Sequence, residues 1–295
     1  MIDQLQRRFR QPGVRLFERD RLVMLELSNA YGSTVITTLG ATVLSYIPAG
    51  GKEVIWVSES ARFDGSKPVR GGIPVCWPWF GPHPDDSALP AHGFARSEDW
   101  ELIAVSGGTQ ESRATFRLEP NERTQSMWPG TFRLQLDITL GRQLQVQLQA
   151  TNLGATPWRV SEALHSYFRV DEARGIGVGD LDGLGYWDKQ QGGVRGIQEQ
   201  PLRVDPPIDR VFFGHRGEAV IHDRDRDIRV GKDGSETTVV WNPGPEGARG
   251  FDDIPDDAWS QMLCVETANA LDNRYTLAPG QTHVMTTSIS SSPCR

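Results

Sequence analysis

The sequence has few cysteines and no long hydrophobic run, and each absence excludes a class of protein. Its three cysteines, Cys76, Cys264 and Cys294, are far apart, so neither a disulfide framework nor a cysteine-based metal motif is predicted. The polar segment 1–10 lacks the apolar core of a signal peptide, and no apolar run approaches membrane-spanning length. We therefore expect reduced thiols and a cytoplasmic protein.

Basic runs are also absent. Asp and Glu outnumber Lys and Arg by 38 to 31, which gives a formal net charge of −7. Proteins that bind nucleic acid usually carry a basic face, so this class is not expected. An anionic substrate would need a local group of arginines that acts against the overall negative field.

One acidic pattern imitates a calcium loop but fails at the decisive positions. Asp223, Asp225 and Asp227 match the start of such a loop. However, Ile228 stands where the loop requires glycine, and Gly234 stands where it requires glutamate. A solvated charged turn fits this segment better. The six histidines show no HExxH or comparable spacing, so no metal site is predicted.

Helical periodicity is nearly absent, and a period of two dominates the apolar pattern. Apolar and polar residues alternate through 132–140 and again through 144–148, which predicts a β-hairpin with one buried face. Further short strands are predicted at 34–39, 42–47, 53–57, 114–118, 239–241 and 282–289. With 31 Gly and 19 Pro spread along the chain, long helices are not expected. We predict an all-β fold, a large antiparallel β-sandwich or barrel, as one domain over 1–295.

The segment 70–100 is too rich in Gly, Pro and Trp for regular structure and too varied for a linker. Long ordered loops of this kind often carry function, although such a loop can also be structural and packed by its own aromatic residues.

Two arginines in this segment, Arg70 and Arg96, have glycine or small neighbours that permit close approach of a ligand. Two guanidinium groups could hold a phosphate group bidentately. For either arginine alone, an ion pair with a nearby carboxylate such as Asp64 or Asp99 is the favoured alternative.

Two histidines could act on a ligand. His92 could donate a hydrogen bond to a hydroxyl or ring oxygen, or bind a loop carbonyl in a structural role. If Leu164 and Phe168 share the buried face of a strand, His165 points the other way and could be a general acid. A structural histidine is the more common alternative at such a position.

Two carboxylates are further candidates. Glu266 ends an apolar run, where burial would raise its pKa toward neutrality as a general base requires. The alternative is an edge charge at a strand end. Asp209 could accept hydrogen bonds from hydroxyl groups, although a local ion pair with Arg210 is favoured.

Together, these residues resemble one family. The motifs are RGGIP at 70–74, HGFAR at 92–96, LHSY at 164–167, and Glu266 followed by Asn269. They resemble the glucose-6-phosphate 1-epimerases, the phosphorylated-sugar branch of the aldose 1-epimerase (galactose mutarotase) superfamily, from about Thr34 to the C-terminus. Some relatives carry Gln immediately before the His-Gly pair, where this chain has Ala91, so any sugar contact of that Gln is absent here.

The resemblance implies a large β-sandwich of the galactose mutarotase type and a role for each candidate residue. It implies His165 as general acid and Glu266 as general base. It also implies Arg70 and Arg96 as phosphate contacts, Asp209 as a sugar-binding carboxylate and His92 as a group near the ring oxygen.

The implied reaction interconverts the α and β anomers of a hexose 6-phosphate without cofactor or metal. Glu266 would take the C1 hydroxyl proton while the imidazolium of His165 protonates the ring oxygen. The C1–O5 bond then opens, the C1–C2 bond rotates, and the steps reverse. Mutual attraction would raise the pKa of His165 and lower that of Glu266, so burial must offset the second effect.

Two alternatives remain: an epimerase of unphosphorylated aldoses, and a non-catalytic carbohydrate-binding sandwich. In every case we expect a monomer whose partner is a small sugar or sugar phosphate, with neither nucleic acid nor membrane as a partner.

Overall fold

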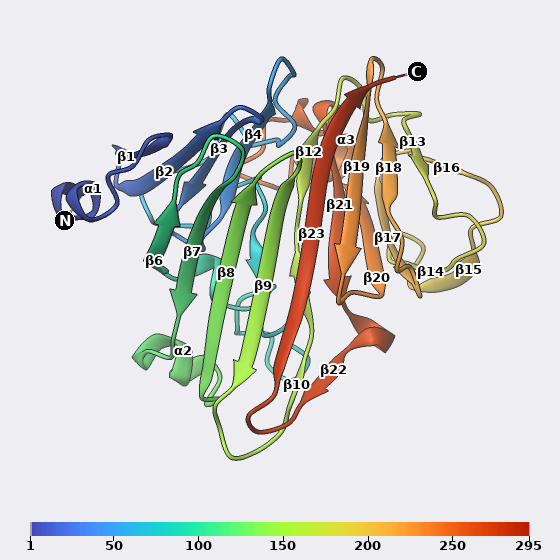
Figure 1. Ribbon diagram of the computed structural model, residues 1–295. Coiled ribbons are helices and arrows are strands. Elements are labelled where there is room, and N and C mark those ends of the chain that lie inside the picture. Colours follow the sequence, from blue (N-terminus) through green and yellow to red (C-terminus); the bar gives the residue numbers. More distant parts are fainter. Residues whose placement is uncertain (1, 295) are drawn as a thin grey trace.

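The computed structural model describes residues 2–294, whose regular secondary structure is mainly antiparallel β-sheet (Figure 1). The largest sheet has nine strands. In spatial order they are β16 (Leu202–Arg203), β13 (Gly177–Gly179), β18 (Ala219–His222), β19 (Arg226–Asp233), β23 (Thr282–Pro293), β9 (Leu144–Asn152), β8 (Phe132–Leu140), β7 (Ser112–Leu118) and β6 (Glu101–Ser106).

An eight-stranded sheet lies behind one half of the nine-stranded sheet in the view of Figure 1. Its strands in order are β15 (Val194–Ile197), β14 (Gly185–Asp188), β17 (Ile208–Phe213), β20 (Thr237–Asn242), β21 (Met262–Asn269), β11 (Glu162–Leu164) and β5 (Val75–Cys76), with β12 (Tyr167–Arg169) also paired to β21.

Two smaller sheets complete the fold. The four-stranded sheet comprises β1 (Val14–Arg19), β2 (Leu22–Asn29), β3 (Gly32–Thr37) and β4 (Val43–Pro48), and the two-stranded sheet comprises β10 (Trp158–Val160) and β22 (Tyr275–Leu277). Helices are short: α1 (Ile2–Arg8), α2 (Glu122–Met127), α3 (Gly244–Ala248) and the 3₁₀ turns η1 (Ala95–Ser97), η2 (Ala258–Gln261) and η3 (Leu271–Asn273). Within residues 2–294, no helix has the length and apolar character needed to cross a membrane.

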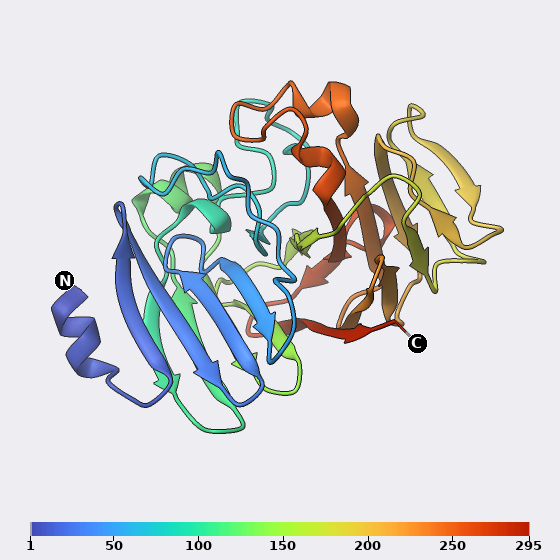
Figure 2. The same ribbon diagram turned by 90° about the horizontal axis from the view of Figure 1, so that it is seen from above.

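One continuous hydrophobic core joins the three larger sheets. It contains Leu25 of β2, Leu136 of β8, Ile228 of β19 and Val265 of β21, all fully buried. Figure 2 shows the four-stranded sheet (blue) on the opposite side of the molecule from strands β14, β15, β17 and β20 of the eight-stranded sheet (gold to orange). The segment that contains β5 connects them, since it pairs with β11 and bridges to β4 through Ile73. The predicted large antiparallel β-sandwich is confirmed.

Seven of the eight segments that the sequence predicts as strands are strands in the structure. In β8 the residues Phe132, Leu134, Leu136, Ile138 and Leu140 are all fully buried, and the strand pairs with β9 across a tight turn. The apolar face packs in the core while the alternate side chains remain partly or fully accessible, apart from Asp137, which hydrogen bonds keep buried.

The prediction of a strand at 53–57 is wrong. This segment makes only isolated bridges, through Ile55 and Val57. The Glu53 carboxylate accepts hydrogen bonds from the backbone N–H groups of Tyr46, at 2.8 Å, and of Ile55, at 3.0 Å. These side-chain contacts satisfy N–H groups that a continuous ladder would otherwise have used.

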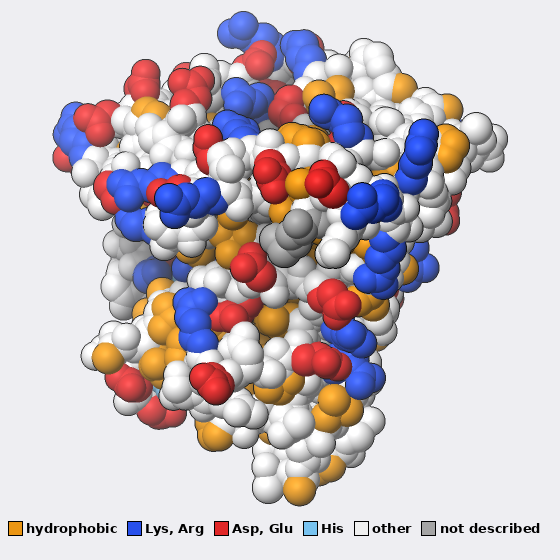
Figure 3. Space-filling view, turned by 90° about the vertical axis from the view of Figure 1, so that its left-hand side faces the viewer, with side chains coloured by type: hydrophobic (Ala, Val, Ile, Leu, Met, Phe, Trp, Pro, Cys, Tyr) orange, Lys and Arg blue, Asp and Glu red, His pale blue; other side chains and the backbone are white. Residues whose placement is uncertain are grey.

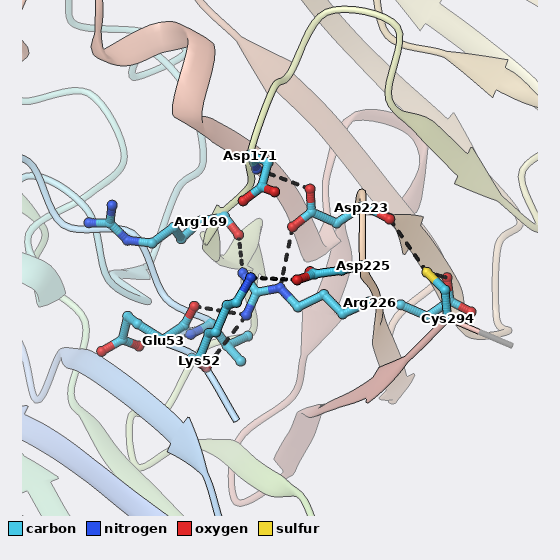
Figure 4. A network of polar contacts seen from close by, with 10 residues as sticks. Lys52, Glu53, Arg169, Asp171, Asp223, Asp225, Arg226 and Cys294 are labelled. Atoms are coloured by element: carbon cyan, nitrogen blue, oxygen red, sulfur yellow. Dashed lines mark hydrogen bonds and ion pairs between the residues drawn. The ribbon is translucent and has the colours of Figure 1, made fainter. Parts of the chain in front are cut away.

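The turn between β18 and β19 is only partly the solvated charged turn that its sequence predicts, because Arg224 and Asp225 are exposed but their neighbours on either side are not. Asp223 and Arg226 are both buried, with Arg226 Nε 3.3 Å from Asp223 Oδ2. The Arg226 guanidinium also donates to the carbonyl oxygens of Glu53, at 2.9 Å, and Arg169, at 2.7 Å (Figure 4). Because its donors are satisfied by backbone carbonyls, this arginine ties three distant segments together.

Charges of both signs are interspersed on the face shown in Figure 3.

The segment 70–100 is anchored in the core by Trp77, which is fully buried and packs against Phe94 and Phe132. Gly93 has a φ of +70° and lies against Trp77, where an added Cβ would be 2.0 Å from the Trp77 carbonyl oxygen. Only glycine fits this contact, which holds the backbone of the HGFAR motif against the backbone of Trp77.

We expect Gly93→Ala to lower the free energy of unfolding by about 2–4 kcal/mol, because it adds a steric clash to left-handed backbone strain. Gly50→Ala is the matched control: Gly50 has the same φ of +70° but no atom within 4 Å of an added Cβ. This control should lose only about 1 kcal/mol. Urea denaturation of both variants measures the difference, and equal losses would show that the Trp77 contact is unimportant.

Candidate active site

A cavity of about 410 Å³ lies on one face of the eight-stranded sheet. Its volume is within the range of small-molecule binding sites. The structure places every residue predicted as a site candidate in its wall, although they come from five segments of the chain: Arg70, His92, Arg96, His165, Asp209 and Glu266.

The antiparallel register places His165 directly opposite Glu266. Strand β11 pairs Leu164 with Thr267, and β12 continues the same register three residues later. His165 follows Leu164 and therefore faces Glu266 across the strand pair, with its Nε2 atom 3.4 Å from Glu266 Oε1. Directly opposed side chains in such a pair interact most strongly, so the sheet itself brings His165 and Glu266 together.

Two cross-strand rows of side chains lie on the face of the sheet that borders the cavity. The first row is Trp187, Val211, Val239, Glu266 and His165. The second row is Lys189, Asp209, Trp241, Cys264 and Tyr167. All of these residues except Cys264 line the cavity. Because residues two apart on a strand point the same way, the two rows face the same side of the sheet.

This pair is almost completely buried, with His165 7% and Glu266 2% exposed. The imidazole of His165 stacks on the Tyr167 ring, with centroids 4.7 Å apart and an interplanar angle of 11°. Within residues 2–294, neither His165 Nδ1 nor Glu266 Oε2 has a hydrogen-bond partner. Buried polar atoms are usually paired, so these two atoms are available to a ligand.

Burial shifts the pKa of the two groups in opposite directions. Desolvation, followed by the nearby His92 and Arg96, holds the pKa of His165 well below its usual value. Desolvation, followed by the charge of Asp209, raises the pKa of Glu266 well above its usual value. Both effects favour a neutral imidazole and a protonated carboxyl, whereas the sequence predicted an ion pair. The two arrangements contain the same single proton and are tautomers of one another.

Arg70 already has a carboxylate partner inside the protein. Its Nε donates to Asp253 Oδ1 at 3.0 Å, and its Nη1 donates to the Tyr167 hydroxyl at 3.4 Å. Its guanidinium also lies over the Phe251 ring, 4.9 Å from the centroid. The expected alternative of an ion pair is therefore correct for Arg70, but the partner is Asp253, which is remote in sequence, and not Asp64.

Arg96 differs from Arg70 in its partners. Its Nη2 donates to the carbonyl oxygen of Ala91 at 2.9 Å. No Asp or Glu of the described chain forms an ion pair with it, so the predicted alternative of a pair with Asp99 is wrong. Its positive charge faces the cavity without a local anion, which makes Arg96 the cation most available to an anionic ligand.

His92 is placed to donate into the cavity. The backbone N–H of Gly81 donates to His92 Nδ1 at 3.4 Å, so a neutral ring carries its proton on Nε2. Burial, followed by the charges of Arg96 and Lys189, lowers the pKa of His92 to about 3. The ring is therefore a neutral donor, and it binds a backbone N–H where a loop carbonyl was the predicted alternative.

Asp209 pairs with a residue that the sequence analysis missed. Lys189 Nζ lies 3.2 Å from Asp209 Oδ2, and burial raises the pKa of Asp209 despite this contact. The predicted pair with Arg210 is wrong, because Arg210 points to the opposite face and binds Asp188 at 2.8 Å. Lys189 occupies a polar turn after β14 where no motif marks it.

Known proteins with similar sequences belong to one family. Residues 23–290 match the family model described as aldose 1-epimerase. A protein of Salmonella typhimurium is 36% identical over 245 residues (82% of this chain, 79% of the relative), and one of Escherichia coli K12 is 34% identical over 254 residues (85% and 84%). Both are named "Putative glucose-6-phosphate 1-epimerase".

The same likeness holds in three dimensions. The crystal structure of "a putative mutarotase (YeaD)" from Salmonella typhimurium superposes on this chain with a TM-score of 0.90. The two sequences are 30% identical in this superposition, which covers 96% of this chain and 95% of that chain.

The two arginines should differ in their effect on stability. Arg70→Ala leaves Asp253, whose side chain is 7% exposed, without its partner, and we expect a loss of about 1–3 kcal/mol. Arg96→Ala breaks no ion pair and should change stability by less than about 0.5 kcal/mol. Thermal and urea denaturation measure both. Adding Asp253→Asn to Arg70→Ala should recover part of the loss, and equal stability of the two single variants would contradict this account.

Proposed function

Because this chain belongs to the aldose 1-epimerase family, we propose that it is an isomerase that interconverts the α and β anomers of glucose 6-phosphate. The observation that carries the proposal is the buried pair of His165 and Glu266, 3.4 Å apart at the floor of the cavity. A carboxyl and an imidazole that share one proton can deliver a proton to one sugar oxygen and remove a proton from another.

Anomer exchange requires both transfers. The C1 hydroxyl must lose its proton and the ring oxygen must gain one, after which the C1–O5 bond opens to the aldehyde. Rotation about C1–C2 turns the carbonyl face, and the reverse transfers close the ring. The enzyme pair holds one proton before and after each half-reaction, so the cycle needs no external acid or base.

We assign Glu266 as the base and His165 as the acid, which requires the proton to move from the carboxyl to the imidazole across their contact. Substrate binding favours this shift. The charge of Arg96 lowers the pKa of His165 in the empty cavity. A phosphate group bound at Arg96 neutralises that charge and therefore stabilises the imidazolium.

Recognition of the phosphate is assigned mainly to Arg96, because Arg70 shares its charge with Asp253. Arg70 adds a second, fixed donor from the same wall. The Nε2–H of His92 and the carboxylate of Asp209 are suited to sugar hydroxyls. The cavity wall also contains Trp187 and Trp241, which offer apolar faces for the sugar ring.

Glu266→Gln should reduce turnover by about 10²–10⁴-fold, because the amide cannot accept the C1 proton. Binding of glucose 6-phosphate should remain detectable by calorimetry, since Gln preserves the shape of the side chain. Saturation transfer between the α and β anomeric protons in NMR measures the turnover.

Glu162→Gln is the matched control for this experiment. Glu162 is also fully buried in the eight-stranded sheet, but it contacts Tyr275 and His283 and does not line the cavity. The folded control should keep its turnover. Full activity of Glu266→Gln would refute the assignment of the base.

A further inference from the structure

We propose that Cys264, His165 and Glu266 form a binding site for a thiophilic divalent cation such as Zn²⁺, and that bound cation reversibly blocks the acid–base pair. The binding half of this inference is independent of the proposed function, and the blocking half rests on it.

The sheet brings the three side chains together. Cys264 and Glu266 are two residues apart on β21, so their side chains point to the same face. His165 lies opposite Glu266 in the register. One potential ligand atom of each residue, the Cys264 thiol sulfur included, lies within 4.8 Å of the other two, and all three residues are buried.

Two of the three residues present unsatisfied atoms. Glu266 Oε2 and His165 Nδ1 are buried without a hydrogen-bond partner in the part of the chain that the structure describes. Glu266 Oε2 can bind a cation that His165 holds through Nε2, whereas Nδ1 is on the far side of the ring and is not a ligand of the same ion. The 3.4 Å between His165 Nε2 and Glu266 Oε1 also fits a shared ion. Two ligands at ordinary zinc distances in a tetrahedral site are about 3.3 Å apart. A cation between these atoms would therefore require little movement of the pair.

The chemistry of the three donors selects the cation. A thiolate, an imidazole and a carboxylate are ligands of Zn²⁺, whereas Mg²⁺ and Ca²⁺ prefer oxygen ligands alone. The Cys264 thiol belongs to an apolar cluster with Tyr167 and Met262. Because the cation binds a thiolate, a carboxylate and a neutral imidazole, coordination must release to solvent both the thiol proton and the proton that Glu266 and His165 share. Since His165 and Glu266 line the cavity, the cation can enter through it and keep a fourth position open toward the sugar site.

Occupation of this site would stop catalysis for a direct reason. The cation would hold the lone pairs of His165 and Glu266 that exchange protons with the sugar. Cys264 itself does not line the cavity, so its removal should abolish cation binding without removing a group that contacts substrate.

The test uses the full chain, freed of metal with a chelator, as wild type, Cys264→Ala and the control Cys76→Ala. Cys76 is equally buried and belongs to the neighbouring β5, but it is outside the three-residue cluster. Zn²⁺ should inhibit anomer exchange of the wild type and Cys76→Ala, and chelator should restore it. Cys264→Ala should keep its metal-free activity and require at least about tenfold more Zn²⁺ for inhibition.

Co²⁺ provides a readout that does not depend on turnover. Wild type and Cys76→Ala should show sulfur-to-cobalt charge-transfer absorption, and Cys264→Ala should not. Equal zinc sensitivity of Cys264→Ala, or Co²⁺ binding without sulfur absorption in the wild type, would overturn the proposal. If Cys264→Ala does not fold, Cys264→Ser, which keeps the size of the side chain, replaces it in both measurements.

Discussion

The register of β11 and β12 against β21 is the constraint on which the rest of the site depends. It is fixed from the core side, where Leu164, Phe168 and Val265 are fully buried in the main hydrophobic cluster. A slip of β11 and β12 by one residue against β21 would turn Leu164 and Phe168 toward the cavity and would bury His165 in the core, away from Glu266. The apolar residues therefore determine where the polar ones lie, and the contact between His165 and Glu266 is a consequence of core packing.

The cations of the cavity differ in whether a carboxylate of the protein already pairs with them. Arg70 and Lys189 each have a carboxylate partner, Asp253 and Asp209 respectively. Arg96 is held only by a backbone carbonyl. In a chain with a net charge of −7, this leaves a local positive site for an anionic group. The cavity wall thus contains three cations, Arg70, Arg96 and Lys189, of which the family resemblance identified only the two arginines.

Sequence reasoning was most successful where a local pattern carries the information. Alternation of apolar residues identified β8 and β9, and the motifs identified His165 and Glu266 as candidates. Their contact could not be read from spacing, because it arises from strand pairing between distant segments. Lys189 was missed for the same reason: a single lysine in a polar turn has no signature, and only the end of β14 beside β17 brings it to Asp209. The burial of Arg226 in the predicted charged turn was also missed, because its partners are backbone carbonyls, which the sequence does not display.

The central claim is that the buried pair and the free charge of Arg96 together act on a phosphorylated sugar. Two-dimensional exchange NMR of the wild-type protein, with glucose 6-phosphate and glucose at equal concentrations, tests it most directly. The account predicts α–β cross-peaks that grow rapidly for the 6-phosphate and at the uncatalysed rate for glucose. Equal acceleration of both sugars would contradict the role given to Arg96, and acceleration of neither would contradict the proposed reaction itself.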